Sequence, residues 1–283
     1  MQHSIADKSD ASQSNELGDR ISIYQPEQSG LKFPKQPAFE SLEKERTHRK
    51  QRLVAGCRAF AMNNFDYGMA GHISVRDPEH SGLYWTNPMA VHFSQVKMSN
   101  LILADHEGRV VEGQHAINRA GFIVHASVHE AHPDVVAMCH AHTPHGTAWC
   151  STGKPIQPYN QDAACFYQNH AVVSDDGGAV TVFTDQGQGV VKAFAENRAV
   201  LHKSHGILTA SRHSVDDAVF WFIAMDRCCH VQLLLEASAT RPELMDDAAA
   251  LHSATHVGSD YVGWLHFQPV YDQVVAANPD MFD

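Results

Sequence analysis

The spacing of apolar residues predicts which parts of the chain are helical and which are extended. Over residues 40–64 the later apolar side chains recur at intervals of three and four, as on one face of an amphipathic helix. Over residues 68–113 short alternating or apolar runs are separated by turn residues, which predicts successive antiparallel strands. These runs are GHISVRD, LYWTNP, VHFSQV and LILADHEGRVVEG.

The second half of the chain continues this mixture of helical and extended patterns. Helical spacing over residues 119–131 ends before His132-Pro133, because the residue before proline disfavours the α conformation. Residues 135–142 and 200–210 are short apolar runs, which favours buried strands. The other expected elements are a helix begun by Thr143-Pro144, an irregular segment to residue 176, a strand at 179–183, a helix at 188–196 and a long helix over 214–239. Helices before, between and after strands predict one α/β sandwich.

The two ends of the chain differ from its middle. Residues 1–36 are rich in Ser, Gln, Asp and Pro, so they bury too little apolar surface to repay the entropy cost of ordering. We expect a flexible N-terminal arm over 1–36, then a folded domain over 37–239. Residues 240–283 contain WLHFQPVYDQVV, whose aromatic residues predict a tail that packs on the domain or on a neighbouring subunit.

Composition restricts the class of partner. The formal net charge of −11, and a most basic segment that mixes signs (EKERTHRKQR), argue against nucleic acid or an anionic membrane. The six cysteines form no CxxC pair, and the sequence has no secretory signal and no run of 18 apolar residues. We therefore expect a cytoplasmic protein that acts on a small molecule.

The residues with the clearest chemistry lie at the end of the apolar run 135–142. On a strand, His140 and His142 point to the same face with their Cα atoms about 6.6 Å apart, so both imidazoles can reach one ion. The spacing alone also fits two polar core residues, because the chain holds 21 histidines. A third candidate ligand is His205, which precedes Gly206 where an apolar run turns sharply.

The pattern around these histidines resembles the class II aldolase/adducin family. The matching motifs are GHISVRDP, NRAGFIVH, HAH and HGILTAS, spread over residues 52–238. The resemblance implies a fold of the α/β class, a single-domain α/β/α sandwich with a largely antiparallel central sheet. It also implies that His140, His142 and His205 hold a divalent ion, zinc first, with iron, manganese or cobalt as alternatives. Members of the family usually assemble as tetramers, so we expect a homo-oligomer, with a homotetramer favoured.

Departures from the sugar-phosphate aldolases of this family fall in one predicted pocket. Those enzymes carry an acid/base Glu four residues before the helix histidine that matches His125, and this chain has Gly121 there. The two preceding positions, serines in those aldolases, are Arg119 and Ala120. His72 replaces the Asn of a Gly-Asn-x-Ser phosphate loop. A pocket without these groups is poorly suited to a sugar phosphate.

Three functions remain consistent with these residues. The first is a metal-dependent carbon–carbon lyase, an aldolase or decarboxylase, that acts on an unphosphorylated oxo or hydroxy acid. The second is a three-His non-haem iron oxygenase that acts on an aromatic 2-oxo acid. The third is an adducin-like interaction protein without catalysis, against which the presence of all three ligand positions argues. We favour the lyase.

Further candidate site residues have weaker support. His72 and His125 lie in matched motifs and are candidates for acid/base work, although a helix histidine often serves only in packing. Tyr159 and Asp162 lie in the irregular segment from which family members bring a tyrosine toward a neighbour's site.

Candidates for substrate binding lie at the start of the 119–131 helix. They are Asn118, Arg119 and Gly121. Arg119 is the strongest of the three in chemical terms, because a guanidinium can bind a carboxylate with two hydrogen bonds.

Overall fold

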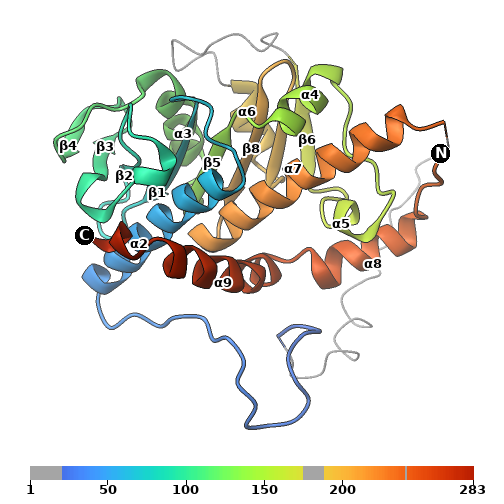
Figure 1. Ribbon diagram of the computed structural model, residues 1–283, viewed down its shortest axis with the longest axis horizontal. Helices are drawn as coiled ribbons and strands as arrows, with labels where there is room; N and C mark the ends of the chain where they lie inside the picture. The colour runs from blue at the N-terminus through green and yellow to red at the C-terminus, as the bar shows by residue number, and fades with distance from the viewer. Residues whose placement is uncertain (1–20, 175–187, 240) are drawn as a thin grey trace, which may run out of the picture. The chain divides into compact units, whose positions relative to one another are not determined.

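The computed structural model describes residues 21–174, 188–239 and 241–283 (Figure 1). By contact density the chain divides into residues Met1–Gln36 and Pro37–Asp283. Of the first unit, the described residues 21–36 form turns and extended chain without a helix or strand. The expected division into an N-terminal arm (1–36), a folded domain (37–239) and a C-terminal tail (240–283) stays a prediction. All elements below belong to the second unit.

A mixed sheet of eight strands forms the centre of this unit, counted over its described residues. The strand order is β4-β3-β2-β1-β5-β8-β7-β6, and β6 pairs with β7 in parallel while the other neighbours are antiparallel. The bounds are β1 Gly71–Arg76, β2 Leu83–Thr86, β3 Ile102–Asp105, β4 Val110–Glu112, β5 Ala137–Ala141, β6 His170–Val173, β7 Ala199–His202 and β8 Gly206–Ser211. The expected largely antiparallel α/β sandwich is confirmed.

Helices cover both faces of the sheet. Helices α2 (Leu42–Met62), α7 (Val215–Ala237) and α9 (Asp260–Ala277) pack together on the near side in Figure 1, with α4 (Pro144–Thr152) against α7. Helices α3 (Arg119–Ala131) and α6 (Gln188–Ala193) pack on the other face. Two further helices, α5 (Gln161–Ala164) and α8 (Asp247–Val257), contact each other at one end.

Side-chain caps set the starts of the helices that carry or frame the candidate site. Asn118, Thr143 and Ser214 each accept a hydrogen bond from a backbone N–H in the first turn of α3, α4 and α7. Pro144 occupies the first position of α4, where its missing N–H costs nothing. The expected starts of these three helices are therefore confirmed.

Strand alternation divides the interior into two cores. On β5, Ala137, Cys139 and Ala141 face the larger core beneath α2 and α7, while Met138 faces the smaller core beneath α3 and α6. Because side chains alternate along a strand, His140 lies on the same face as Met138. The same alternation places His72 of β1 on the α3 face.

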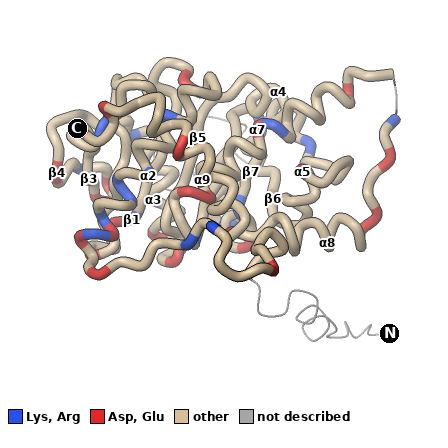
Figure 2. Tube along the Cα trace, turned by 60° about the horizontal axis from the view of Figure 1, so that its bottom comes forward, with Lys and Arg blue, Asp and Glu red and all other residues tan. Residues whose placement is uncertain are grey.

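Helix α7 is long and apolar enough to cross a membrane, but half of its most apolar window is buried inside the protein. It packs against α9, α4, β8 and β5, as the central helix of the larger core does. Lys and Arg residues are dispersed among Asp and Glu residues along the described chain (Figure 2).

Two expectations about local structure are wrong. The run VHFSQV forms a 3₁₀ turn, η1 (Phe93–Gln95), followed by η2 (Met98–Asn100), because the His92 side chain accepts a hydrogen bond from Ser94 N and competes with strand pairing. The segment expected to be irregular contains α5 and β6, and β6 is stabilised by pairing with β7, which local sequence does not reveal. The strand expected at 179–183 lies outside the described residues. The chain ends in a 3₁₀ turn, η4 (Pro279–Phe282).

Candidate metal centre and its cavity

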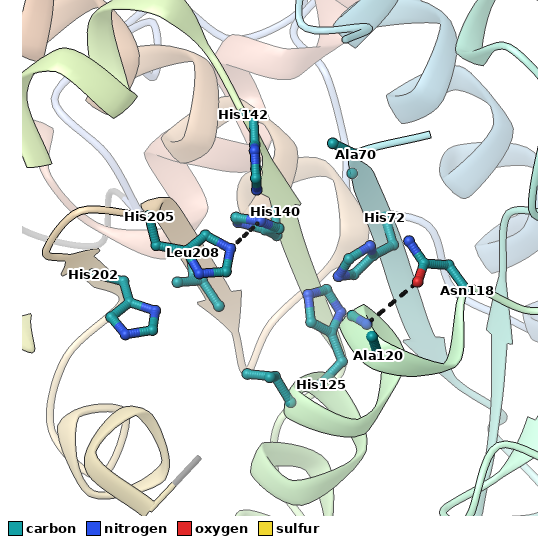
Figure 3. Close-up of a pocket in the computed structure, with 13 residues that line it drawn as sticks. Ala70, His72, Asn118, Ala120, His125, His140, His142, His202, His205 and Leu208 are labelled. Atoms are coloured by element: carbon teal, nitrogen blue, oxygen red, sulfur yellow. Dashed lines mark hydrogen bonds between the residues drawn. The ribbon is translucent and has the colours of Figure 1, made fainter. Parts of the chain in front are cut away.

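Three histidines from two places in the sequence converge at one end of the neighbouring interior strands β5 and β8. His140 is in β5, His142 follows it, and His205 lies in the turn between β7 and β8 (Figure 3). One ring nitrogen from each lies within 4.8 Å of the other two, and Nε2 of His140 is 3.2 Å from Nε2 of His205. The structure therefore brings together the three residues that the sequence nominates as ligands.

The tight turn before β8 presents His205 to the other two rings. His140 and Leu208 are partners in the β5–β8 pairing, so the start of β8 lies beside the end of β5. The sequence led us to expect the unusual backbone at Gly206, but the left-handed residue is Ser204, with φ 61°. A non-glycine residue in this conformation stores strain, which is common where a side chain must be aimed.

The three rings fit a divalent cation. Nδ1 of His140 donates to the carbonyl oxygen of Ile207 at 2.8 Å, which leaves the lone pair of Nε2 facing His205. Two nitrogens that bind one tetrahedral ion at about 2.0–2.1 Å lie about 3.3 Å apart, close to the observed spacing. Burial lowers the pKa of His140 and of His142, so both rings are neutral, as ligands must be.

A cavity of about 170 Å³ opens beside the three rings. Its walls combine six histidines with small or apolar side chains, and no Lys, Arg, Asp or Glu is among the described residues that line it. The lining residues are Ala70, Gly71, His72, Asn118, Ala120, Gly121, Val124, His125, His140, His142, His202, His205 and Leu208. Such a cavity suits a small, largely apolar molecule with few polar groups.

His72 and His125 form a second pair of rings in this cavity. Their ring centroids are 4.6 Å apart in an edge-to-face arrangement, and His72 lies 5.3 Å from His140 by the same measure. Burial is the largest cause that lowers the pKa of both rings. Nδ1 of His72 and Nε2 of His125 are buried and lack a hydrogen-bond partner within the described chain. Buried polar atoms in this state are costly unless a ligand satisfies them.

The ring of His72 occupies the space next to Gly121. A Cβ atom added to Gly121 would lie 1.9 Å from Cε1 of His72, far inside van der Waals contact. The position where related aldolases are expected to carry Glu therefore has room for no side chain while His72 keeps this orientation. The two departures noted in the sequence, at positions 72 and 121, are therefore in direct contact in the structure.

Of the three predicted substrate-binding residues, two line the cavity and one does not. Asn118 and Gly121 line the cavity, where Asn118 Oδ1 accepts from Gly121 N at 3.5 Å. Arg119 is exposed, and its Nε donates to the carbonyl oxygen of Glu107 at 3.4 Å. Arg119 therefore does not line the cavity of its own chain, and its role as a carboxylate clamp stays a prediction.

Tyr159 and Asp162 do not reach the cavity of their own chain. Neither is among the residues that line it, and the Asp162 carboxylate lies 3.5 Å from Nε of Arg227 on the exposed side of α7. A role for either residue at a neighbouring subunit's site stays a prediction.

Sequence reasoning missed three polar residues around the cavity. His202 lines it and stacks on His205 with centroids 4.9 Å apart. Ser74 and His129 lie behind His125 and hydrogen-bond to each other. The recurrence of His202 three residues before His205 was an available signal, whereas the Ser74–His129 contact depends on how α3 packs on β1.

Comparison with known proteins places this geometry in context. The protein-family model described as "Class II Aldolase and Adducin N-terminal domain" matches residues 51–233 of this chain. The chain is 38% identical over 251 residues to "Decarboxylase NovR" of Streptomyces niveus, covering 88% of this chain and 92% of that protein. It is 37% identical over 251 residues to "4-hydroxy-3-prenylphenylpyruvate oxygenase/4-hydroxy-3-prenylbenzoate synthase" of Streptomyces roseochromogenus subsp. oscitans, covering 88% and 90% of the two chains.

Solved structures share the fold. The structure of "L-fuculose 1-phosphate aldolase" from Glaciozyma antarctica superposes with a TM-score of 0.82 at 33% identity. That match covers 88% of this chain and 97% of the other. An aldolase II superfamily protein from Pseudomonas syringae superposes with a TM-score of 0.77 at 21% identity, which supports the fold alone.

Proposed function

The chain belongs to the class II aldolase and adducin family, and from that premise we propose that it is a metal-dependent carbon–carbon lyase of decarboxylase or aldolase type. Its proposed substrate is an unphosphorylated oxo or hydroxy acid. The observation that carries the proposal is the set of three converging imidazoles, His140, His142 and His205, at the wall of a cavity that contains no charged side chain among its described lining residues.

A divalent ion held by the three histidines would supply Lewis acidity toward a carbonyl or carboxylate oxygen. The protein supplies the rest. Ala70, Ala120 and Val124 give the cavity wall an apolar portion that suits an apolar group. His72 and His125 add to the same wall, and each has a buried ring nitrogen without a hydrogen-bond partner among the described residues.

The lack of Lys, Arg, Asp and Glu among the described residues of the cavity wall supports this substrate class. A phosphate dianion requires cations or several N–H donors for binding, and the described lining offers no Lys or Arg. A monoanionic oxo or hydroxy acid needs less compensation, because one carboxylate can be matched by a bound divalent ion. Two relatives, one named as a decarboxylase and one as a prenylphenylpyruvate oxygenase, agree with an oxo or hydroxy acid as substrate.

The test is turnover of a panel of 2-oxo, 3-oxo and hydroxy acids in an anaerobic chamber, with protein loaded with Zn²⁺, Co²⁺ or Mn²⁺. A lyase needs no redox change, so we expect carbon–carbon cleavage of at least one panel member without oxygen. The matched control is the His205→Ala variant under the same loading. Equal cleavage by that variant would contradict the proposal.

A second candidate function is an iron-dependent oxygenase that acts on an aromatic 2-oxo acid. The observation that favours it is the 37% identity to the protein named as a prenylphenylpyruvate oxygenase. Three imidazoles accept iron as well as zinc, so the ligand set does not separate the two functions. Strict dependence on Fe²⁺ and O₂, with oxygen consumed in proportion to product, would establish this second function in place of the first.

A further inference from the structure

A chain of buried hydrogen bonds lies directly behind His125. Ser74 on β1 contacts two rings of α3: its Oγ is 2.8 Å from Nδ1 of His125 and 2.9 Å from Nε2 of His129. Nδ1 of His129 is 3.2 Å from the carbonyl oxygen of Val135. Ser74, His125 and His129 are each fully buried. The lyase proposal gives no role to Ser74 or His129.

The direction of each hydrogen bond can be worked out from the carbonyl oxygen of Val135, which lies at one end of this series of hydrogen bonds. Arg76 Nη2 donates its two hydrogens to the carbonyl oxygens of His129 and His132, so it has none left for His129 Nδ1 at 3.5 Å. A carbonyl oxygen only accepts, so His129 Nδ1–H donates to Val135. Burial and the charge of Arg76 hold the pKa of His129 at about 3 and keep the ring neutral.

A neutral ring that donates from Nδ1 must accept at Nε2. The Ser74 hydroxyl therefore donates its one hydrogen to Nε2 of His129. Its oxygen is then left to accept, and the donor at 2.8 Å is Nδ1–H of His125. With its proton on Nδ1, neutral His125 has a bare lone pair on Nε2.

That lone pair belongs to a residue of the cavity wall and has no hydrogen-bond partner within the described chain. An acceptor in this position attracts a hydroxyl group and repels a carboxylate. The three-His cluster on the other wall has the opposite preference once it holds a cation.

We propose that Ser74 and His129 are positioning residues that lock His125 in its Nδ1–H tautomer, so that Nε2 accepts a hydrogen bond from a substrate hydroxyl. The inference rests on the proposed function and narrows its substrate class. The substrate carries a carboxylate or carbonyl oxygen for the metal side and a hydroxyl, or the enol of a 2-oxo acid, for the His125 side. A 2-hydroxy acid with an apolar substituent meets these requirements.

The direct test is nitrogen-15 NMR of full-length protein labelled at histidine and loaded with Zn²⁺. Imidazole nitrogens with and without a proton have well-separated shifts, and the spectrum of a His125→Gln variant assigns the His125 signals. We expect a protonated Nδ1 and an unprotonated Nε2 in the unaltered protein. A protonated Nε2 would overturn the proposal without any variant.

Variants at Ser74 test whether its hydroxyl determines the tautomer of His125. Ser74→Ala removes the acceptor for His125 Nδ1–H, so we expect the His125 signals to move toward the Nε2–H tautomer. Ser74→Thr keeps a hydroxyl and should retain the original tautomer. The control is Ser211→Ala, because Ser211 is also buried, and in the part of the chain that the structure describes its hydroxyl accepts from the backbone N–H groups of His213 and Ser214. Unchanged His125 signals in Ser74→Ala would refute the role of Ser74.

A binding experiment tests whether the protein recognises a hydroxyl group on the substrate. Phenyllactate and its O-methyl ether differ only in the ability to donate a hydrogen bond, and one such bond corresponds to about tenfold in affinity. We expect metal-loaded protein to prefer phenyllactate by about that factor, and Ser74→Ala to lose most of the preference. Equal affinity for the two compounds, or binding of neither, would overturn the assigned substrate class.

The two proposals can fail separately. The tautomer measurement needs no turnover, so it can succeed when the panel of acids is not cleaved. Conversely, metal-dependent cleavage combined with a protonated Nε2 would leave the lyase standing and remove the positioning role of Ser74 and His129.

Discussion

Two buried polar clusters at opposite ends of β1 differ in how far their polar atoms are satisfied by hydrogen bonds. At the end of β1, both carboxylate oxygens of Asp77 are satisfied: Arg46 donates two hydrogen bonds at 2.6 and 3.0 Å, Trp85 Nε1 donates at 2.9 Å, and the backbone N–H groups of Glu79 and His80 donate at 3.0 and 2.9 Å. At the start of β1, His72 packs against His125 of α3 in the cavity wall, and each ring has a buried nitrogen without a hydrogen-bond partner in the described chain.

The difference separates a structural cluster from a binding cluster. A fully satisfied buried carboxylate rigidifies the fold, and loss of one partner leaves an uncompensated charge. Unsatisfied buried nitrogens lower stability until a ligand binds. Changes at Asp77 should therefore affect folding, and changes around His72 and His125 should affect binding and turnover.

The largest expected effect is on turnover by Gly121→Ala. The added Cβ displaces His72, and a displacement of about 1 Å in a catalytic pocket costs about 10²-fold. Alanine favours helix over glycine by about 1 kcal/mol, so the thermal midpoint should not fall in parallel. The measurement is kcat/KM on whichever acid the panel identifies.

Gly82→Ala is the matched control for that variant, because a Cβ at Gly82 meets no atom within 4 Å. It should keep full activity. If Gly121→Ala also kept full activity, the close contact with His72 would have no functional meaning and the comparison would break down.

A smaller effect, on stability alone, is expected at Asp77. Asp77→Asn should lower the free energy of unfolding by about 3 kcal/mol, because it leaves Arg46 short of its buried counter-charge. Glu79→Gln removes a half-exposed partner of the same arginine and should cost less than about 1 kcal/mol. Urea denaturation measures both values, and equal losses would contradict the structural role of Asp77.

The same cluster predicts how stability depends on pH. Burial alone would raise the pKa of Asp77, but hydrogen bonds from Arg46, His80 and Trp85 lower it far below its usual value. Because the folded pKa is the lower one, the contribution to stability is present above the unfolded pKa of about 3.9 and is lost as pH falls below it. Asp77→Asn should therefore flatten the loss of stability at acid pH relative to the unaltered protein.

The smallest expected effect is a null result with sugar phosphates. The unaltered protein should not cleave fuculose or rhamnulose phosphates, because no Lys or Arg is among the described residues that line the cavity. Gly121→Glu should not restore this activity, because the ring of His72 fills the space next to position 121. Product formation from these sugars can be followed by coupled assay. Turnover at about 1 s⁻¹ or faster would place this chain with the sugar-phosphate enzymes.

Local sequence predicted the elements and the three converging histidines well, because strand period, proline and N-cap residues act over a few positions. His-x-His on a strand and His before Gly206 led directly to the observed cluster. The pairing of β6 with β7 and the left-handed backbone at Ser204 could not be predicted, since contacts distant in sequence determine them.

Side-chain direction was the main limit at the site. The helix that begins at Arg119 was predicted within its observed bounds, yet the rotation of α3 on the sheet sends Arg119 outward and His125 inward. The hydrogen bond between Ser74 and His129 joins residues 55 positions apart, and only the packing of α3 on β1 creates it.

The measurement that tests the central claim most directly is metal content by mass spectrometry on protein purified without a His tag. We predict stoichiometric divalent metal in the unaltered protein, loss of most of it in His142→Ala, and retention in His202→Ala, which alters the same cavity outside the three-His cluster. Circular dichroism should show that both variants remain folded. Stoichiometric metal in folded His142→Ala would contradict the three-histidine centre.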